Sequence, residues 1–369
     1  MIGPALTPAE RARAADDLVD RVLRTRAACG ERYPLFAAPA GGSWTTSRRG
    51  SWCAGIWIGL LRLAAAHSGE AAVAREAFDR ARGLEHWVTT DAVTRAMVLH
   101  CATDPADAQD TVTRSPVLQR LREDGARALA TAFSPDLGAI PDGTALGHGE
   151  PGARTCSVDA TAAVIDLLHG ALRVPGAPEV AWWHARTLLG AVTPDGRLSA
   201  AHRLRADGIG TEPVGRAGAW ARGQAWALLG AARAVHAWGE PWLAPARMIA
   251  GHWATLPVPP PDTAGEAVPV DTAAAAIAAD GLRLLAAADP ERAASNHAAA
   301  EALCAALVRG HLTGSAPGVL PGAPRGVLAD ACYRTGPRVR EQVECVWGCY
   351  HLLRALGDTG AAVVPAFRS

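Results

Sequence analysis

The sequence contains no lysine, because all 36 of its basic residues are arginine. Without lysine the chain cannot form a Schiff base through a side-chain amine, and it cannot contain a phosphate-binding loop that ends in Gly-Lys. The 36 acidic residues balance the arginines, so the formal net charge is zero. A neutral chain lacks the cationic surface that attracts nucleic acids and anionic membranes, and we expect neither as a partner.

Long apolar runs are also missing, and none is long enough to span a bilayer. The first residues, MIGPALTPAERARAADDLVDRVL, lack the apolar core of a signal peptide and lead directly into an amphipathic helix. Eight cysteines are present without a CxxC pair, and Cys345 and Cys349 stand four apart. We interpret the cysteines as small core residues or free thiols, and we expect a cytoplasmic protein. His and Cys show no metal-ligand spacing, so the sequence predicts neither a metal nor another cofactor.

Helical patterns, in contrast, recur from end to end, while strand patterns are scarce. Gly/Pro punctuation such as SPDLGAIPDG and LPVPPPD separates the helical segments. The predicted helices are 7–28, 52–67, 70–85, 91–101, 115–133, 158–173, 178–191, 219–238, 241–255, 271–287, 290–309 and 341–356.

Two kinds of helix alternate along these 369 residues. Segments such as DATAAVIDLLHGAL are apolar nearly all round and should be buried, whereas segments such as EAAVAREAFDRARGLEHW carry an Arg-rich face for solvent. Stacked helical hairpins produce this alternation, either as an open solenoid or as a closed ring. Polar and aromatic residues at the start of the buried helices favour the ring, whose mouth they would line. We predict one all-α domain over 1–369, an (α/α)6 barrel, because no linker divides the chain.

The segment WARGQAW is the clearest pointer to a ligand. Trp220 and Trp226 offer flat apolar faces for the C–H groups of a sugar, and Arg222 and Gln224 offer directed hydrogen bonds to hydroxyls or a carboxylate. The segment runs straight into an apolar helix, which would place these side chains at the mouth of the barrel. The sequence therefore predicts a small saccharide as the substrate.

Two aspartates open mostly apolar segments, Asp91 in WVTTDAVTRAMVLH and Asp159 in CSVDATAAVIDLL. From composition alone, each is explained more simply as a helix N-cap, a position that lowers the pKa of a carboxyl. The functional interpretation is a carboxyl pair across a sugar pocket, in which burial and the second negative charge raise the pKa of the acid. The residues alone leave both interpretations open.

Three further residues are candidates on weaker grounds. His202, in DGRLSAAHRL, is either a surface-loop histidine or a sugar ligand. Glu212, in GIGTEPVGRAGAW, is placed on the loop that approaches WARGQAW. Asp271 we interpret as the cap of the helix DTAAAAIAADGLRLL.

Taken together, these segments resemble the unsaturated glucuronyl hydrolases, glycoside hydrolase family 88. GSWCAGIWIGLLRLAA, which contains Trp52, resembles the family's Gly-Phe-Trp-x-Gly-x-x-Trp segment, and VDATAAVIDLL is similar to Ile-Asp-x-Met-Met-Asn-Leu. TPDGRLSAAH resembles Arg-x-Asp-Gly-Ser-x-x-His, and WARGQAW stands before an inner helix as in the family. VDTAAAAIAADGLRLL and VWGCYHLLRAL resemble the last two family segments, so order and approximate spacing agree over most of the chain.

The resemblance implies an (α/α)6 barrel and the hydration of the C4=C5 enol ether of a terminal unsaturated uronic acid. It places Asp159 as general acid and then base, and Asp91 as the carboxylate that holds sugar hydroxyls and tunes Asp159. It assigns the ring and its carboxylate to a set of substrate-binding residues, namely Trp52, His202, Glu212, Trp220, Arg222, Gln224 and Trp226. This chemistry needs no metal, and the protein is expected as a monomer or homodimer.

Several positions depart from the family pattern. Thr90 stands where the family has His, Ala163 where it has Asn, and Glu212 where it has Gln. These changes disfavour glycosaminoglycan disaccharides as substrates and keep three alternatives open. The fold could tailor a modified sugar or nucleoside in specialised metabolism, it could act on rhamnogalacturonan fragments like glycoside hydrolase family 105, or it could be a non-catalytic sugar-binding toroid.

Overall fold

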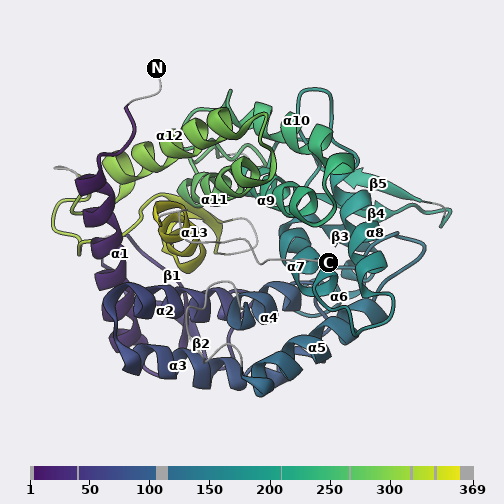
Figure 1. Ribbon diagram of the computed structural model, residues 1–369, viewed down its shortest axis with the longest axis horizontal. Coiled ribbons are helices and arrows are strands. Elements are labelled where there is room, and N and C mark those ends of the chain that lie inside the picture. Colours follow the sequence, from purple (N-terminus) through teal and green to yellow (C-terminus); the bar gives the residue numbers. More distant parts are fainter. Residues whose placement is uncertain are drawn as a thin grey trace.

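The computed structural model describes residues 4–39, 41–104, 115–208, 210–265, 267–315, 319–335 and 339–357. Within these ranges six buried helices form a closed inner ring, in which each contacts the next and the last contacts the first (Figure 1). The inner helices are α2 (Ala54–Ser68), α4 (Arg95–Thr103), α7 (Thr161–His169), α9 (Ala221–Trp238), α11 (Thr272–Ala288) and α13 (Val346–Leu356).

Amphipathic helices surround this ring, and each packs on the inner helix beside it. They are α1 (Pro8–Cys29), α3 (Ala71–Arg82), α5 (Pro116–Thr131), α8 (Ala177–Leu189), α10 (Leu243–Trp253) and α12 (Ala293–His311). The chain alternates between the outer and the inner layer, so that consecutive helices form hairpins. The prediction of an all-α (α/α)6 barrel is confirmed.

Small residues let the inner helices approach closely. The backbone of α4 passes so near Gly55 in α2 that a Cβ there would lie 1.9 Å from the carbonyl oxygen of Val98. In α11 the run Ala273–Ala279 is buried, and Gly281 lies against the backbone of Leu229 in α9. The alanine-rich segments are therefore the ones that can fill the crowded centre of the ring, where larger side chains would overpack.

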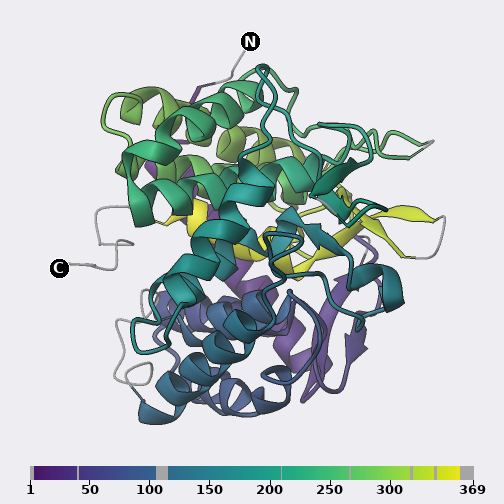
Figure 2. The same cartoon turned by 90° about the vertical axis from the view of Figure 1, so that its right-hand side faces the viewer.

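Two small antiparallel sheets lie at one end of the ring, to the right in Figure 2. The first has the strand order β2-β1-β7-β6, formed by β1 (Tyr33–Ala37), β2 (Thr45–Ser47), β6 (Ala331–Arg334) and β7 (Arg340–Cys345). The second has the order β3-β4-β5, formed by β3 (Thr155–Ser157), β4 (Ala201–Leu204) and β5 (Thr211–Val214). Because β7 leads directly into α13 and β3 into α7, this end holds the N-termini of the inner helices and is the mouth of the barrel.

Backbone pairing at the mouth of the barrel changes where three of the predicted helices begin. The residues predicted to begin the last helix, 341–345, belong to β7, because they pair with β6 and β1 and Glu344 is buried against Arg21. The helix predicted from Asp91 begins at Arg95, because the preceding turn is tied to the loop at Asp142. The helix predicted from Val158 begins as a 3-10 turn, Val158–Ala160, and becomes α-helical at Thr161. In each case pairing at the mouth overrides local helical preference.

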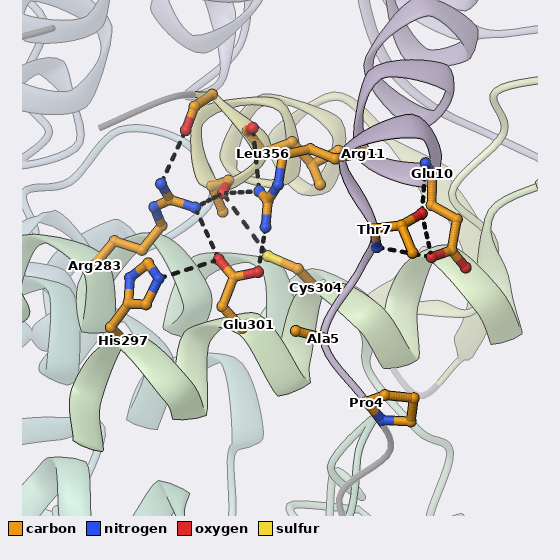
Figure 3. A network of polar contacts seen from close by, with 12 residues as sticks. Pro4, Ala5, Thr7, Glu10, Arg11, Arg283, His297, Glu301, Cys304 and Leu356 are labelled. Atoms are coloured by element: carbon orange, nitrogen blue, oxygen red, sulfur yellow. Dashed lines mark hydrogen bonds and ion pairs between the residues drawn. The ribbon is translucent and has the colours of Figure 1, made fainter. Parts of the chain in front are cut away.

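Two arginines bind the C-terminal end of α13 to the helices beside it (Figure 3). Arg11 of α1 bonds the carbonyl oxygen of Leu356 at 3.2 Å, and Arg283 of α11 bonds those of Ala355 at 2.6 Å and Gly357 at 2.9 Å. Glu301 of α12 pairs with both guanidinium groups. The C-terminal carbonyls of α13, which have no partner within the helix, are thus satisfied by cations at the negative end of its dipole.

All eight cysteines are free and buried, which confirms their interpretation as small core residues with free thiols. None of the described helices combines the length and the apolar character needed to cross a membrane.

Candidate active site

The segment WARGQAW forms the start of α9, at the mouth of the barrel. Trp220 occupies the N-cap position with an extended backbone, and α9 begins at Ala221. Trp226 is buried one turn and a half further along and packs edge-on against His351 of α13, with ring centroids 5.2 Å apart. The two tryptophans therefore lie at different depths, one at the rim and one inside the ring.

Arg222 is the centre of an aromatic cluster. Its Nη1 donates to Asp271 Oδ2 at 3.0 Å and to the carbonyl oxygen of Cys332 at 2.5 Å. Its guanidinium carbon lies within 6 Å of three ring centroids, at 5.5 Å from Trp220, 5.9 Å from Tyr333 and 5.6 Å from Trp347. Cation–π contacts and a buried carboxylate thus fix the position of this cation.

Trp52 extends the same cluster from the start of α2. Its ring lies 4.8 Å from that of Trp347, and its indole N–H points to the hydroxyl of Tyr333 at 3.4 Å. Trp52 remains partly exposed. Aromatic residues from α2, α9, β6 and α13 therefore form one wall around Arg222.

Asp271 has the capping role predicted for it. Its Oδ1 accepts the backbone N–H groups of Ala273 and Ala274 at the start of α11, and also that of Cys332 at 3.2 Å. The residue is fully buried, which raises the pKa of its carboxyl, while the charge of Arg222 opposes this shift. Asp271 serves as an N-cap and as the counter-ion of Arg222 at once.

Gln224 is buried and holds a loop. Its side-chain amide exchanges two hydrogen bonds with the backbone of Leu198. The backbone carbonyl oxygen of Gln224 accepts the indole N–H of Trp253 at 3.4 Å. Leu198 belongs to the segment that leads into β4 and His202. The amide predicted to contact substrate is therefore engaged in positioning this segment.

Asp159 lies in the 3-10 turn before α7 and does not cap that helix through its side chain. The residue keeps part of its exposure, yet its Oδ1 is buried and has no hydrogen-bond partner among the described residues. Burial raises the pKa of this carboxyl, although a hydrogen bond from the backbone N–H of Ala160 and the nearby charges of His148 and Arg222 oppose the rise. A carboxyl with these properties is suited to donate a proton at neutral pH.

Asp142 is a second buried carboxyl near the barrel mouth, and the sequence analysis missed it. Its Oδ2 accepts the hydroxyl of Ser157 at 2.8 Å, while its Oδ1 is buried without a partner in the described part of the chain. Burial and the charge of Asp159 raise the pKa of Asp142 to about 7. Asp142 lies in a Pro-Asp-Gly turn with no regular periodicity, so only a search for every carboxyl near the barrel mouth could have found it.

Asp91 differs from this pair. Its Oδ2 accepts the backbone N–H of Thr144 at 2.8 Å and the Thr144 hydroxyl at 2.6 Å. These bonds, the hydroxyl first, lower the pKa of the exposed Asp91 carboxyl. Asp91 does not cap α4, whose N-cap is Thr94. Its carboxylate is held by a loop, and the charge that raises the pKa of Asp142 belongs to Asp159.

His202 and Glu212 lie on the neighbouring strands β4 and β5 with different exposure. His202 is buried, its Nε2 has no partner in the ranges that the structure describes, and burial lowers its pKa. It is backbone-paired with Cys156 of β3, two residues from the start of the turn that holds Asp159. Glu212 is exposed opposite Arg203, and it does not line the cavity at Asp159.

A cavity of about 40 Å³ opens beside Asp159 and Trp226 along the axis of the ring. This volume holds a few water molecules. It continues for about two helical turns, or roughly 10 Å, to Asp166 on α7 and Arg233 on α9. Polar side chains with balanced charge line its deeper part, namely His100, Asp166, Arg233, Asp280, His351 and Arg354.

The carboxylates in this deeper part are paired. Asp166 Oδ2 lies 3.0 Å from Arg233 Nε and 3.3 Å from His100 Nε2. Asp280 Oδ2 lies 2.7 Å from His351 Nδ1 and 3.0 Å from Arg354 Nε. Asp159 differs from both, because no arginine or histidine of the described chain bonds its Oδ1.

Comparison with known proteins agrees with this geometry at the level of the fold. No family model matches the chain, and no curated protein matches it. Among solved structures, an unsaturated glucuronyl hydrolase from Bacillus sp. GL1, responsible for the degradation of glycosaminoglycan, superposes with a TM-score of 0.78 at 23% identity, covering 94% of this chain and 96% of that one.

Two further structures superpose over similar lengths. An unsaturated glucuronyl hydrolase specific for heparin has a TM-score of 0.75 at 20% identity, over 95% of this chain and 96% of its own. A variant of the Streptococcus agalactiae enzyme, complexed with dGlcA-GalNAc6S, has a TM-score of 0.70 at 18% identity, over 96% and 92%. The chain has the fold of the unsaturated glucuronyl hydrolases.

This hydrolase fold gathers most of the predicted site residues at one end. Trp52, Trp220 and Arg222 share the aromatic cluster, Asp159 and Trp226 share the cavity, and His202 lies on the strand beside β3. It leaves Glu212 exposed on β5 and engages Gln224 with the backbone. Within the described residues no three His, Cys, Asp or Glu side chains gather as a metal site.

Proposed function

We propose that the protein hydrates the C4=C5 enol ether of a terminal unsaturated uronic acid, or of a similar unsaturated sugar, and so releases the group linked at C1. The observation that carries this proposal is Asp159. Its carboxyl lines the axial cavity at the mouth, has a buried oxygen that no described residue hydrogen-bonds, and has a raised pKa caused by burial. The shared fold with the unsaturated glucuronyl hydrolases supports the same reaction class.

The reaction needs one group that gives and then takes a proton. The neutral carboxyl of Asp159 donates its proton to C4, and the positive charge that develops is shared between C5 and the ring oxygen. Water then attacks C5 and passes a proton to the Asp159 carboxylate, which restores the acid. The net change is addition of water across C4=C5. The resulting hemiketal opens, and the hemiacetal linkage at C1 collapses with loss of the aglycone alcohol.

The remaining predicted residues are proposed to hold the sugar. Nη1 of Arg222 is engaged by Asp271 and Cys332, so Nε and Nη2 are the donors proposed for the uronate carboxylate. Trp52, Trp220 and Trp226 supply apolar faces for the ring. His202, kept neutral by burial, supplies a neutral ring nitrogen to a sugar hydroxyl. Asp91, already held by Thr144, is proposed to accept hydroxyls at the rim rather than protons.

A panel of unsaturated uronide disaccharides and related unsaturated sugars tests the proposal. Loss of the ultraviolet absorbance of the conjugated double bond reports hydration, and Asp159→Asn is expected to lower the rate by at least about a hundredfold. Asp124→Asn, at a half-exposed aspartate on α5 far from the cavity lining, is the matched control and should leave the rate unchanged. Absence of turnover across the whole panel, with Asp159→Asn indistinguishable from the unaltered protein, would overturn the proposal.

A further inference from the structure

A short irregular segment before α11 contacts several elements of the candidate site. We call its described residues, 260–265 and 267–271, the clasp. Its two arms are joined, because the N–H of Asp262 donates to the carbonyl oxygen of Pro269 at 2.8 Å. In Figure 2 it projects from the mouth end of the barrel, as the hairpin of β6 and β7 does. The clasp is therefore a folded unit at the mouth, and it leads directly into α11.

Thr263 joins the clasp to the start of α9. Its N–H and its hydroxyl both donate to the carbonyl oxygen of Ala219, at 2.8 Å and 3.2 Å. Ala219 is buried and immediately precedes Trp220, the N-cap of α9. The Thr263 hydroxyl also accepts a hydrogen bond from Arg216 Nη2 at 2.8 Å. Three hydrogen bonds thus fix the clasp to the loop that leads into WARGQAW.

Asp262 joins the clasp to β7. Its Oδ1 accepts Nη1 of Arg340 at 2.6 Å and the backbone N–H of Ala264 at 3.0 Å. The side chains of Asp262 and Arg340 are only 2% and 24% exposed, so the ion pair is largely removed from water. Arg340 begins β7 and is paired there with Arg334 of β6. The clasp thus holds the hairpin that also carries Cys332.

These connections surround the acceptors of Arg222. Its Nη1 donates to Asp271, at which the clasp ends, and to the carbonyl oxygen of Cys332 in β6. Asp271 Oδ1 in turn accepts the N–H of Cys332 at 3.2 Å. The helix that carries Arg222 begins beside Ala219, which Thr263 binds. All three elements that set the orientation of Arg222 are therefore attached to the clasp.

We propose that Asp262 and Thr263 are positioning residues, which through the clasp set the direction in which Arg222 presents Nε and Nη2 to the carboxylate of the substrate. The inference rests on the proposed function, in which Arg222 binds a uronate. Neither residue lines the axial cavity, and both act through the elements that they bind.

The physical reason is that a buried ion pair fixes a position more than it adds stability. The lost hydration of the two charges offsets much of their attraction, so the net gain in stability is small. A displaced clasp, however, would leave the Asp262 carboxylate buried without its cation, which is costly. The pair with Arg340 therefore favours one placement of β7 relative to the start of α11.

The clasp can be tested without substrate by amide hydrogen exchange in the full-length protein. Arg340→Gln removes the cation of Asp262. We expect the N–H groups of Thr263 and Cys332 to exchange at least about tenfold faster, because their acceptors lie on elements that the clasp no longer holds in place. Unchanged exchange at both amides would overturn the proposal.

Arg247→Gln is the matched control. Arg247 pairs with Asp289 at 2.7 Å, and their side chains are 27% and 1% exposed, much as in the pair at the mouth. Asp289 is the C-cap of α11, at the other end of that helix. Both substitutions remove the cation of a buried carboxylate, but only Arg340→Gln should loosen the mouth. Equal acceleration at Thr263 in the two variants would show a general loss of stability and contradict positioning.

Kinetics measure the effect on binding. An interaction made equally in the ground state and the transition state affects KM and leaves kcat unchanged. Arg340→Gln is therefore expected to raise KM for a hydrated uronide roughly tenfold, with kcat within about twofold. Arg340→Lys, which restores a cation for Asp262, should recover most of this loss, and Arg247→Gln should leave KM unchanged. A fall in kcat without a change in KM would contradict the proposed role.

Thr263→Val tests the second connection without changing a charge. It removes the hydroxyl that bonds Ala219 and Arg216, and it is expected to raise KM about threefold. Thr255→Val, at an exposed threonine whose hydroxyl bonds only its own turn after α10, is the control and should leave KM unchanged. This variant keeps the test decisive if Arg340→Gln folds poorly, because an unaltered KM in Thr263→Val also contradicts the proposal.

The two measurements separate the clasp from the proposed function. If the amides exchange faster as expected but the unaltered protein hydrates no uronide, the clasp stands and the proposed function fails. If uronides are hydrated while exchange and KM stay the same in the variants, the function stands and the positioning role fails.

Discussion

Gln224 and Leu198 exchange two hydrogen bonds, at 3.0 Å from the Leu198 N–H to Oε1 and at 2.8 Å from Nε2 to the Leu198 carbonyl. The side-chain amide thus bonds both the N–H and the carbonyl of Leu198, as a neighbouring β-strand would, in the loop that leads to β4. The loop and the start of α9 are held together in this way, and with them His202 and Arg222, which lie on different elements of the site.

Gln224→Glu should therefore destabilise the protein. A glutamate accepts from Leu198 N–H but cannot donate to the Leu198 carbonyl, and a buried donor or acceptor left unsatisfied costs about 1–3 kcal/mol. Urea unfolding measures this loss. Gln342→Glu, at an exposed position of β7, is the control and should change the free energy of unfolding by no more than about 0.5 kcal/mol. Equal losses in both variants would contradict the role of Gln224.

Arg222→Ala is expected to impair folding as well as binding. It leaves the fully buried Asp271 without its counter-ion, and removing one partner of a buried ion pair costs about 3–5 kcal/mol. Arg222→Lys restores a charge but not the planar group that contacts three rings, so it should recover stability only in part. Thermal unfolding separates the two variants. A fully stable Arg222→Ala protein would show that Asp271 needs no cation.

Stability should fall in acid partly because of Asp280. Burial opposes its charge, but Arg354 and His351 outweigh burial and hold the pKa of Asp280 well below its usual value. A carboxyl with a lowered folded-state pKa contributes stability above its unfolded-state pKa, near 3.8, and this contribution is lost as the pH falls below that value. Urea unfolding between pH 7 and pH 3 should show the loss.

Asp280→Asn isolates that contribution. The variant should lose about 3–5 kcal/mol at pH 7, because Arg354 keeps its charge without its carboxylate partner. Its free energy of unfolding should also change less between pH 5 and pH 3 than that of the unaltered protein. An unchanged pH slope would mean that Asp280 is not the carboxyl responsible. Asp124→Asn, at a half-exposed position, serves again as the control.

The thiols should be inert in the folded protein. All eight cysteines are buried, and burial raises the pKa of Cys156 and Cys304 to about 12 and that of Cys332 to about 11. Because the thiolate is the reactive form, a colorimetric thiol reagent at pH 8 should react slowly with native protein and with eight thiols after unfolding. Rapid reaction of several thiols before unfolding would contradict this burial.

Much of the barrel could be predicted from periodicity. Helices such as α9 and α11 are apolar nearly all round over four or more turns. Few arrangements other than the inner layer of a ring bury a helix on every side. The strands β1 to β7 escaped prediction because they are three to six residues long and become strands only by pairing with other segments. A six-residue stretch such as REQVEC carries no periodicity that excludes a helix.

The candidate site was predictable in part for the same reason. Trp220, Arg222 and Asp159 stand at the starts of recognisable buried helices, where a sequence pattern can locate them. Asp142 stands in an irregular turn, and its partner Ser157 lies fifteen residues away. The engagement of Gln224 by Leu198 and of Asp91 by Thr144 depends on loop conformation, which composition and spacing do not encode.

The sequence by itself determined the helical class, the alternation of buried and exposed helices, and the helix start that carries Arg222, because hydrophobic periodicity is a local property of the chain. Only the tertiary structure decided which carboxyls are neighbours. It joined Asp142 to Ser157 and Asp91 to Thr144, because burial and the groups around a carboxyl depend on segments that meet only when the ring closes.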